Sequence, residues 1–307
     1  MSLKIVFMGT SEFSVPTLEA LIKNKFNIIK VYTQPPKKSN RGQKINKSPI
    51  QSLSETLNIE FRTPSFLKDN LEEKNFLQNL NADLAIVVAY GQIIPSDFLN
   101  ITKKGFVNIH ASLLPKWRGA APIQKTITNL EKKTGISIMK IDEKLDAGPI
   151  CNSYVLDLLE NENTESLTNR LSLLAAEKIL DDIDAILEDK AIFKSQDDTK
   201  ATYANKILKS EGKINWSEPA KNIIGKINGL YPNSFFIYKG ERYKILKAEP
   251  SNKIGETGNV LSNNLDIGCK EGSIKILEIQ REGKRAQKIN EFILGSKIKK
   301  GSNLKNV

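Results

Sequence analysis

The chain has 307 residues, 39% hydrophobic and 26% charged, a composition typical of a globular protein long enough for two domains. Two cysteines and one histidine argue against a His/Cys zinc site, and we expect no metal. We see no secretory signal and no apolar run of membrane-spanning length, so we expect a cytoplasmic protein without a membrane partner.

The net charge of +11 is concentrated in the last third of the chain. Residues 1–189 hold 23 Lys and Arg against 23 Asp and Glu, whereas residues 190–307 hold 23 against 12. A neutral body with a basic appendage is typical of a protein that binds a polyanion. The alternative is a lysine-rich surface without a specific partner, because Lys greatly outnumbers Arg.

The first 189 residues alternate between strand and helix patterns. Apolar runs predict strands at 3–9, 27–33, 82–91, 105–111 and 134–141. Helical spacing of apolar residues predicts helices at 14–23, 64–80 and 164–189. This alternation favours an α/β domain over residues 1–189, with a Rossmann-like, doubly wound, mostly parallel sheet.

The last third of the chain has a different texture. Residues 190–206 are polar and mixed, and we interpret them as a linker. Beyond them a helix is predicted at 218–228, followed by short strands at 235–240, 243–249, 258–262 and 273–280. Short strands at this spacing favour a small C-terminal β-barrel, OB-like, over residues 207–307.

The first strand ends in Gly9, the position at which a dinucleotide-binding motif would begin. The second and third glycines of that motif are replaced by Ser11 and Ser14. The second glycine is the one that lets the backbone approach a pyrophosphate, so NAD or FAD binding is disfavoured.

The only histidine, His110, lies two residues after Asn108 on the predicted strand 105–111, so both side chains face the same way. They lie at the carboxyl end of the strand, where open α/β sheets bind ligands. An asparagine amide can hold a developing oxyanion, and an imidazole can donate to the same centre or move a proton. Asp146, on the loop after the predicted strand 134–141, is the candidate to orient the imidazole.

An Asn–His–Asp trio suits acyl transfer by direct attack of an amine. Ser112 lies close by, but no G-x-S-x-G elbow surrounds it, so a covalent acyl-serine is disfavoured. The alternative is a structural role, in which Asn108 and His110 form a hydrogen-bonded pair and Asp146 caps a turn.

The stretch "NIHASLLPKWRGAAPIQ" followed by "KLDAGPI" resembles the signature of the 10-formyltetrahydrofolate-dependent formyltransferase family. With "VYTQPPKKSNRGQK" and "GKINWSEPA", the resemblance covers nearly the whole chain and is nearest to members that formylate methionyl initiator tRNA. It implies that Asn108 and His110 stabilise a tetrahedral oxyanion. It also implies that Asp146 holds His110 and helps to relay the proton that leaves the amine.

The resemblance further implies where the two substrates bind. The formyl donor 10-formyltetrahydrofolate would contact a loop made of Ser112, Leu113, Leu114 and Pro115, with residues 89–95 as a wall of its pocket. No metal or redox cofactor is implied, and we expect a monomer. The family often has a Trp-Pro-containing turn where this chain has "GLYPNSFF", residues 229–236, which leaves the details of the barrel open.

A basic segment, residues 34–49, carries five cations and no acid: Lys37, Lys38, Arg41, Lys44 and Lys47. Such a run is usually a solvated loop. In the resembled family the matching loop inserts at the acceptor end of the tRNA, and Arg41 is the residue best suited to phosphate and base contacts.

Other activities fit the same trio. A relative could formylate a sugar nucleotide or a purine precursor, neither of which needs a basic barrel, or could hydrolyse the folate with water as the nucleophile. The alternative from a different functional class is a noncatalytic RNA-binding protein that kept the fold and lost the reaction. Retention of all three polar residues argues against it, because an idle site would tolerate their loss.

Overall fold

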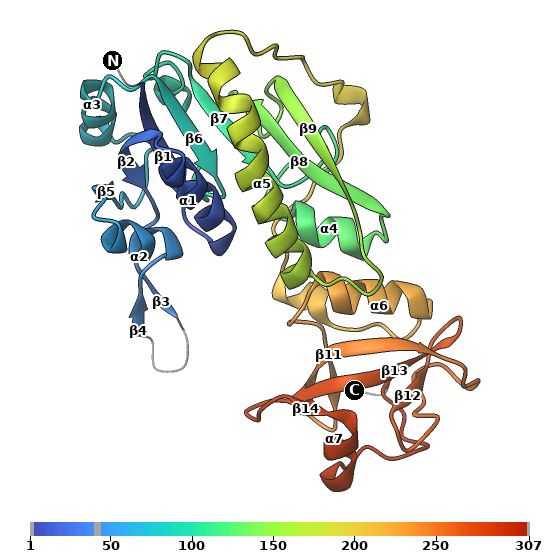
Figure 1. The fold of residues 1–307 in the computed structure, drawn as a ribbon. Coiled ribbons are helices and arrows are strands. Elements are labelled where there is room, and N and C mark those ends of the chain that lie inside the picture. Colours follow the sequence, from blue (N-terminus) through green and yellow to red (C-terminus); the bar gives the residue numbers. More distant parts are fainter. Residues whose placement is uncertain (1–2, 40–43, 306–307) are drawn as a thin grey trace. The chain divides into compact units, whose positions relative to one another are not determined.

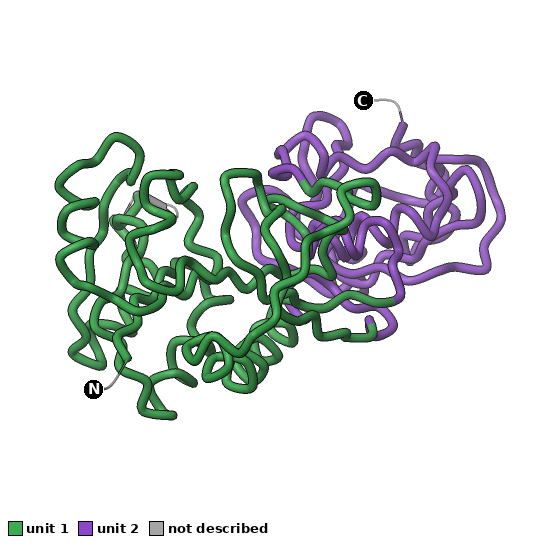
Figure 2. The backbone as a smooth tube through the Cα atoms, turned by 90° about the horizontal axis from the view of Figure 1, so that it is seen from above, with its two compact units in different colours: residues 1–122, 133–157, 168–204 green, residues 123–132, 158–167, 205–307 purple. Residues whose placement is uncertain are grey.

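The computed structural model describes residues 3–39 and 44–305 (Figure 1). The chain divides into two compact units (Figure 2). The first contains residues 1–122, 133–157 and 168–204, and the second contains residues 123–132, 158–167 and 205–307. Neither unit is therefore a single continuous stretch of the chain.

The first unit is built on a seven-stranded sheet with the order β5-β2-β1-β6-β7-β8-β9. Five strands run parallel, whereas β8 is antiparallel to β7 and β9 is antiparallel to β8. The predicted α/β class with a Rossmann-like, mostly parallel sheet is confirmed, and the antiparallel edge was not foreseen. The strands are β1 (Lys4–Gly9), β2 (Asn27–Tyr32), β5 (Phe61–Arg62), β6 (Leu84–Val88), β7 (Phe106–His110), β8 (Lys133–Lys140) and β9 (Ile150–Asp157).

Burial explains how these strands take their places. Every residue of β6 is buried, as expected for an apolar run in the middle of a sheet covered on both faces. Strand β9 is partly exposed along its length and forms one edge of the sheet. The carboxyl ends of β1, β6 and β7 meet at the same edge because these strands are parallel neighbours.

The helices begin at identifiable caps. Ser48 Oγ accepts from Gln51 N at 2.9 Å, and Asn70 Oδ1 accepts from Glu73 N at 3.1 Å. In the first unit the helices are η1 (Glu12–Ser14), α1 (Val15–Lys23), α2 (Pro49–Thr56), α3 (Leu71–Asn79), η2 (Ser96–Phe98), α5 (Thr164–Leu187, within this unit from residue 168) and η3 (Asp198–Lys200).

The basic segment forms a small two-stranded sheet, β3 (Lys37–Ser39) and β4 (Lys44–Asn46). The two strands are antiparallel, with Lys37 opposite Asn46 and Lys38 opposite Ile45. Arg41 lies outside the described residues. Of the described cations predicted to meet tRNA, Lys37, Lys38 and Lys44 lie on this hairpin, and Lys47 directly follows it.

The second unit holds an antiparallel sheet with the order β10-β11-β13-β12, and β14 pairs with β13. The predicted barrel is confirmed as an antiparallel half-barrel sheet. The prediction of a strand at 258–262 was wrong, because Asn259 and Val260 form only isolated bridges. The elements are α4 (Pro122–Thr128, within this unit from residue 123), η4 (Lys209–Gly212), α6 (Ala220–Gly229), β10 (Phe235–Tyr238), β11 (Glu241–Ser251), β12 (Asp266–Gly268), β13 (Ser273–Arg281), β14 (Gln287–Lys288) and α7 (Ile289–Gly295).

A chain of aromatic rings forms part of the core of the second unit. Trp216 meets Phe236 edge-on with ring centres 5.8 Å apart, and Phe236 stacks on Tyr243 at 5.4 Å. Tyr243 in turn meets Phe292 of α7 edge-on at 6.0 Å. These contacts join α7 to the sheet through apolar packing.

Candidate active site

Asn108 and His110 lie on β7, between β6 and β8. Asn108 is opposite Val87 of β6, and His110 is opposite Ser137 of β8. His110 is only 6% exposed, whereas Asn108 is half-buried. Within residues 3–39 and 44–305, nothing hydrogen-bonds the side-chain amide of Asn108, so that amide is available to a ligand.

The imidazole of His110 has a polar neighbour at each of its nitrogens. Nε2 lies 2.9 Å from the carbonyl oxygen of Trp117. Because a carbonyl only accepts, Nε2 is the donor in this hydrogen bond. Nδ1 faces Asp146 Oδ2 at 3.6 Å, an ion-pair distance rather than a hydrogen bond. The predicted partners His110 and Asp146 therefore lie side by side.

Asp146 is held in turn by the backbone on the other side of the site. Its Oδ2 accepts from Gly119 N at 2.8 Å. Asp146 adopts a left-handed φ of 47°, which a non-glycine residue needs local support to hold, whereas the φ of 117° at Gly119 is open to glycine. The Asp146 side chain is 16% exposed, so it lies near solvent while the hydrogen bond from Gly119 N keeps it in one position.

The predicted folate loop, residues 112–115, is cross-linked by Ser137 of β8. Ser137 Oγ donates to Ser112 O at 2.8 Å and accepts from Leu114 N at 3.0 Å. Ser112 itself is fully buried, and its hydroxyl donates to Lys116 O at 2.6 Å. The hydroxyl is thus committed to the backbone, in agreement with the absence of a nucleophile elbow in the sequence.

The segment 89–95 is tied to the beginning of the basic hairpin. Tyr90 O accepts from Thr10 Oγ1 at 2.6 Å and from Gln34 Nε2 at 3.0 Å. Gln34 Nε2 also donates to Gly91 O at 2.7 Å, and Gln34 Oε1 accepts from Lys37 Nζ. Tyr90 is buried, and burial raises the pKa of its phenol above the ordinary range. The same hydrogen bonds therefore connect residues 89–95, the candidate pocket wall, to the start of the candidate tRNA-binding hairpin.

Sequence reasoning missed the residues that surround this site from the segment 190–206. Gln196 Oε1 accepts from Arg118 Nη2 at 2.8 Å, and Thr202 Oγ1 accepts from Trp117 N at 2.9 Å. A polar, aperiodic stretch carries no pattern that assigns it to a site. The only clue in the sequence to these contacts was Arg118, because a buried arginine needs polar partners from elsewhere in the chain.

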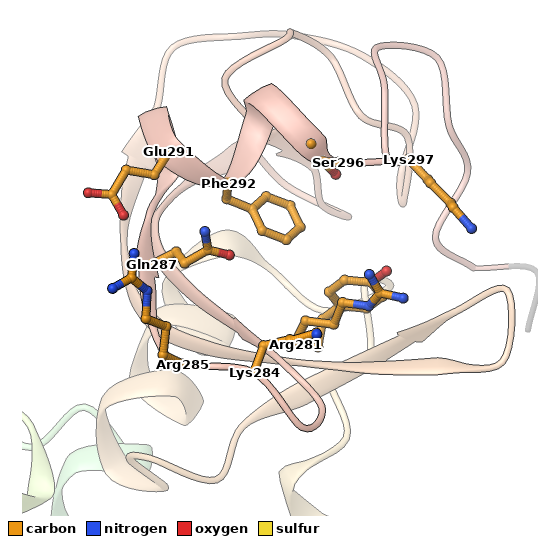
Figure 3. Close-up of a pocket in the computed structure, with 10 residues that line it drawn as sticks. Arg281, Lys284, Arg285, Gln287, Glu291, Phe292, Ser296 and Lys297 are labelled. Atoms are coloured by element: carbon orange, nitrogen blue, oxygen red, sulfur yellow. The ribbon is translucent and has the colours of Figure 1, made fainter.

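The second unit carries a cavity of about 280 Å³ between β13, β14 and α7 (Figure 3). Phe292 and Gln287 extend into it, and Arg281, which also lines it, pairs with Glu241. Burial, followed by the hydrogen bond to Glu241, raises the pKa of Tyr243 to about 12. Four cations are among the residues that line the cavity: Arg281, Lys284, Arg285 and Lys297.

Across residues 3–39 and 44–305, no group of three or more His, Cys, Asp and Glu side chains is arranged to hold a metal ion. In the same part of the chain, none of the helices is long and apolar enough to cross a membrane.

Comparison with protein families assigns the chain to a class. Residues 3–183 match the family described as Formyl transferase, and residues 206–297 match Formyl transferase, C-terminal domain. The chain is therefore a formyltransferase, an enzyme with the two-part organisation of that class.

Curated relatives narrow the class. The chain is 62% identical over 310 residues to the methionyl-tRNA formyltransferase of Pelagibacter ubique (strain HTCC1062), covering 100% of both chains. It is 40% identical to that of Jannaschia sp. (strain CCS1), covering 98% of this chain and 99% of that protein. The chain belongs to the methionyl-tRNA formyltransferase family.

Solved structures share the fold at low identity. The N-formyltransferase from Helicobacter canadensis, in complex with folinic acid and dTDP-3-aminofucose, has a TM-score of 0.70 and 20% identity, covering 91% of this chain and 99% of that one. HypX from Aquifex aeolicus, in complex with tetrahydrofolic acid, has a TM-score of 0.67 and 15% identity, covering 98% of this chain and 49% of that one. These likenesses establish the common fold.

Proposed function

We propose that the chain transfers the formyl group of 10-formyltetrahydrofolate to the α-amine of methionine on initiator tRNA. One observation carries the proposal. The His110 ring is fixed between Trp117 O and the Asp146 carboxylate, beside an Asn108 amide that has no partner in the described chain. Full-length identity of 62% to a methionyl-tRNA formyltransferase supports the choice of acceptor.

The reaction is written as a direct transfer. The amine nitrogen attacks the formyl carbon, and the carbonyl oxygen becomes a tetrahedral oxyanion. The bond from the formyl carbon to N10 of the folate then breaks, and the proton lost by the amine moves to N10. Bringing two bound substrates together supplies much of the acceleration.

The contacts of His110 define how the trio would act on the oxyanion. With Nε2 donating to Trp117 O, a second proton on Nδ1 makes the ring a cation that faces the Asp146 carboxylate. The charged ring then stabilises the oxyanion electrostatically while Asn108 donates a hydrogen bond to it. Asp146 keeps the ring in place and helps to relay the leaving proton.

The donor would lie between the loop of Ser112, Leu113, Leu114 and Pro115 and the segment 89–95. Support comes from the rigidity of both pieces. The loop is pinned by Ser137, and the segment is pinned through Tyr90 O and Gly91 O. A donor site formed by fixed backbone needs little rearrangement when the folate binds.

The acceptor would meet cations in both units. In the first unit these are Lys37, Lys38, Lys44 and Lys47 of the hairpin segment, together with Arg41. In the second unit we propose the cavity lined by Arg281, Lys284, Arg285 and Lys297 as a contact for the RNA phosphate backbone (Figure 3). Support comes from the charge excess of residues 190–307 and from a cavity in which cations outnumber acids.

The reaction is tested by incubating purified protein with methionylated initiator tRNA and 10-formyltetrahydrofolate. Mass spectrometry of the released aminoacyl group should show formylmethionine, and elongator tRNA charged with methionine serves as the comparison. The His110→Ala variant should still bind the tRNA but lose turnover. Unmodified methionine at saturating donor would refute the proposed activity.

The cavity contact is tested by replacing Lys284 and Arg285 together with Ala. The KM for tRNA should rise, and the slope of log(kcat/KM) against log salt should become shallower by about one to two. A matched control removes the same charge from Lys253 and Lys270, two exposed residues of the same unit that do not line the cavity. Equal effects from both pairs would indicate a general charge effect and would contradict a contact at the cavity.

A further inference from the structure

The segment 194–204 is hydrogen-bonded to the first unit at both ends and contacts the candidate site between them. Lys194 pairs with Ile150 at the start of β9, with N–H to O distances of 2.8 Å in both directions. Tyr203 forms a parallel bridge with Arg118, and Ala204 N donates to Arg118 O at 2.7 Å. The segment was predicted to be part of a linker, yet it is bonded into the first unit.

On one side of the imidazole, this segment supports Asp146 through Gln196. Gln196 Nε2 donates to Asp146 O and to Gly148 O, both at 2.8 Å. Its Oε1 accepts from Arg118 Nε at 3.1 Å and Nη2 at 2.8 Å. Every polar atom of the Gln196 amide is used, and two of its bonds grip the backbone that carries the left-handed Asp146.

Arg118 gives Gln196 a fixed anchor. Its side chain is 3% exposed, and its Nη2 also pairs with Asp198 at 2.7 Å. A buried guanidinium cannot lose its proton, so its partners are held firmly. A neutral amide at position 196, rather than a second carboxylate, keeps additional negative charge away from Asp146.

On the other side of the imidazole, the same segment supports Trp117 through Thr202. Trp117 N donates to Thr202 Oγ1 at 2.9 Å, and Arg118 N donates to Thr202 O at 2.8 Å. Trp117 has a left-handed φ of 61°, a conformation that needs such support. The carbonyl that receives His110 Nε2–H belongs to this same residue.

We propose that Gln196 and Thr202 are positioning residues for formyl transfer, each fixing the group that holds one side of the His110 ring. The proposal rests on the proposed role of His110 in that reaction. Neither side chain contacts the ring itself. Thr202 acts through Trp117, whose carbonyl accepts from the ring, and Gln196 acts through Asp146, whose carboxylate faces it. Supports of this kind set the orientation of a catalytic group, and an error of about 1 Å lowers turnover more than binding.

The test uses substitutions that preserve shape. Thr202→Val removes the acceptor and keeps the branched side chain, whereas Thr202→Ser keeps the acceptor. Gln196→Glu keeps the acceptor for Arg118 but turns an oxygen toward two carbonyl oxygens. We expect kcat to fall about tenfold for Thr202→Val and for Gln196→Glu, with the KM values for both substrates within twofold of wild type. Thr202→Ser should have a kcat close to that of wild type.

A matched control makes the same change elsewhere in the segment. Thr199 is exposed, and its Oγ1 donates only to Asp197 Oδ1 at 2.6 Å, away from the ring supports. Thr199→Val should leave kcat unchanged. A loss equal to that of Thr202→Val would show that any hydroxyl in the segment matters and would overturn the proposal.

Two further readouts separate positioning from general stability. His110 is the only histidine, so the full chain purified with a histidine-free tag gives one set of imidazole ¹⁵N signals that needs no assignment. Thr202→Val and Gln196→Glu should shift these signals, and Thr199→Val should not. Coincidence of all four spectra would overturn the proposal whether or not the wild type formylates tRNA, so this result is independent of the proposed function.

The second readout is kinetic. His110→Ala loses steady-state turnover, so the residual transfer is followed in single turnovers with enzyme in excess. In that background the residual rate should be the same with and without Thr202→Val, because there is no ring left to position. A further tenfold loss in that background would show that Thr202 acts independently of His110. Absence of formyl transfer by the wild type would instead count against the proposed function, leaving the spectra to decide the positioning role.

Discussion

Replacement of Asp146 by Asn tests the charge that faces the imidazole. The two side chains have the same shape, and an amide oxygen can still accept from Gly119 N. The amide then removes the negative charge 3.6 Å from His110 Nδ1. Any effect on the reaction therefore comes from charge rather than from a lost support.

The magnitude follows from this distance. Unit charges 3.6 Å apart attract by about 5 kcal/mol at an effective dielectric constant of about 20. Partial exposure of Asp146 and its hydrogen bond from Gly119 reduce the usable part to about 2–3 kcal/mol. If that energy stabilises the charged ring in the transition state, kcat should fall roughly 30- to 150-fold with both KM values nearly unchanged.

The assay is steady-state formylation at saturating donor and tRNA, with Asp142→Asn as the matched control. Asp142 lies on the same loop, is exposed, and accepts only from Glu143 N. The control should retain wild-type kcat. A kcat for Asp146→Asn within threefold of wild type would refute electrostatic support by Asp146, and a selective rise in the KM for tRNA would assign the residue to binding instead.

Two more predictions concern Gly119 and the thiols. A Cβ on Gly119 would lie 2.8 Å from Ala204 O at a φ of 117°, so Gly119→Ala should lower the free energy of unfolding by roughly 1–3 kcal/mol in urea melts. Gly240 has a φ of 76° but no neighbour within 4 Å, so Gly240→Ala should lower the free energy of unfolding by less. An equal decrease in both variants would show that the positive φ alone causes the destabilisation. Burial raises the pKa of Cys151 and Cys269 to about 11, which depletes the thiolate at pH 8. Native protein should therefore react with iodoacetamide roughly 100-fold more slowly than denatured protein, and a difference below tenfold would contradict the shift.

The parts of the fold that were predictable are those whose periodicity is strong. The apolar runs of β1, β6 and β7 and the long stripe of α5 each have one reasonable interpretation. Strand β9 was missed because its half-exposed pattern mixes with polar residues at the edge of the sheet. The antiparallel direction of β8 was not accessible either, since direction depends on the path of the connecting chain rather than on local pattern.

The site divides in the same way. Asn108 and His110 could be paired from the strand period alone, because residues two apart share a face. Asp146 could be named from the residues only as a candidate, because a loop after a strand has no period that brings it to His110, and the family resemblance strengthened the choice. Gln196 and Thr202 could not be predicted, since their role depends on hydrogen bonds between residues 78 and 85 positions apart in the chain.

The division of the chain into units limits how it can be cut and recombined. The second unit includes two segments from earlier in the chain, residues 123–132 and 158–167. Thr164 Oγ1 donates to Gly229 O at 2.5 Å, and a Cβ on Gly229 would lie 2.5 Å from Thr128 Cγ2. A fragment that begins at residue 205 would leave this packing surface of α6 bare. Chimeras that exchange acceptor-binding parts between relatives should therefore carry three segments together, and a single crossover after residue 204 should give poorly soluble hybrids.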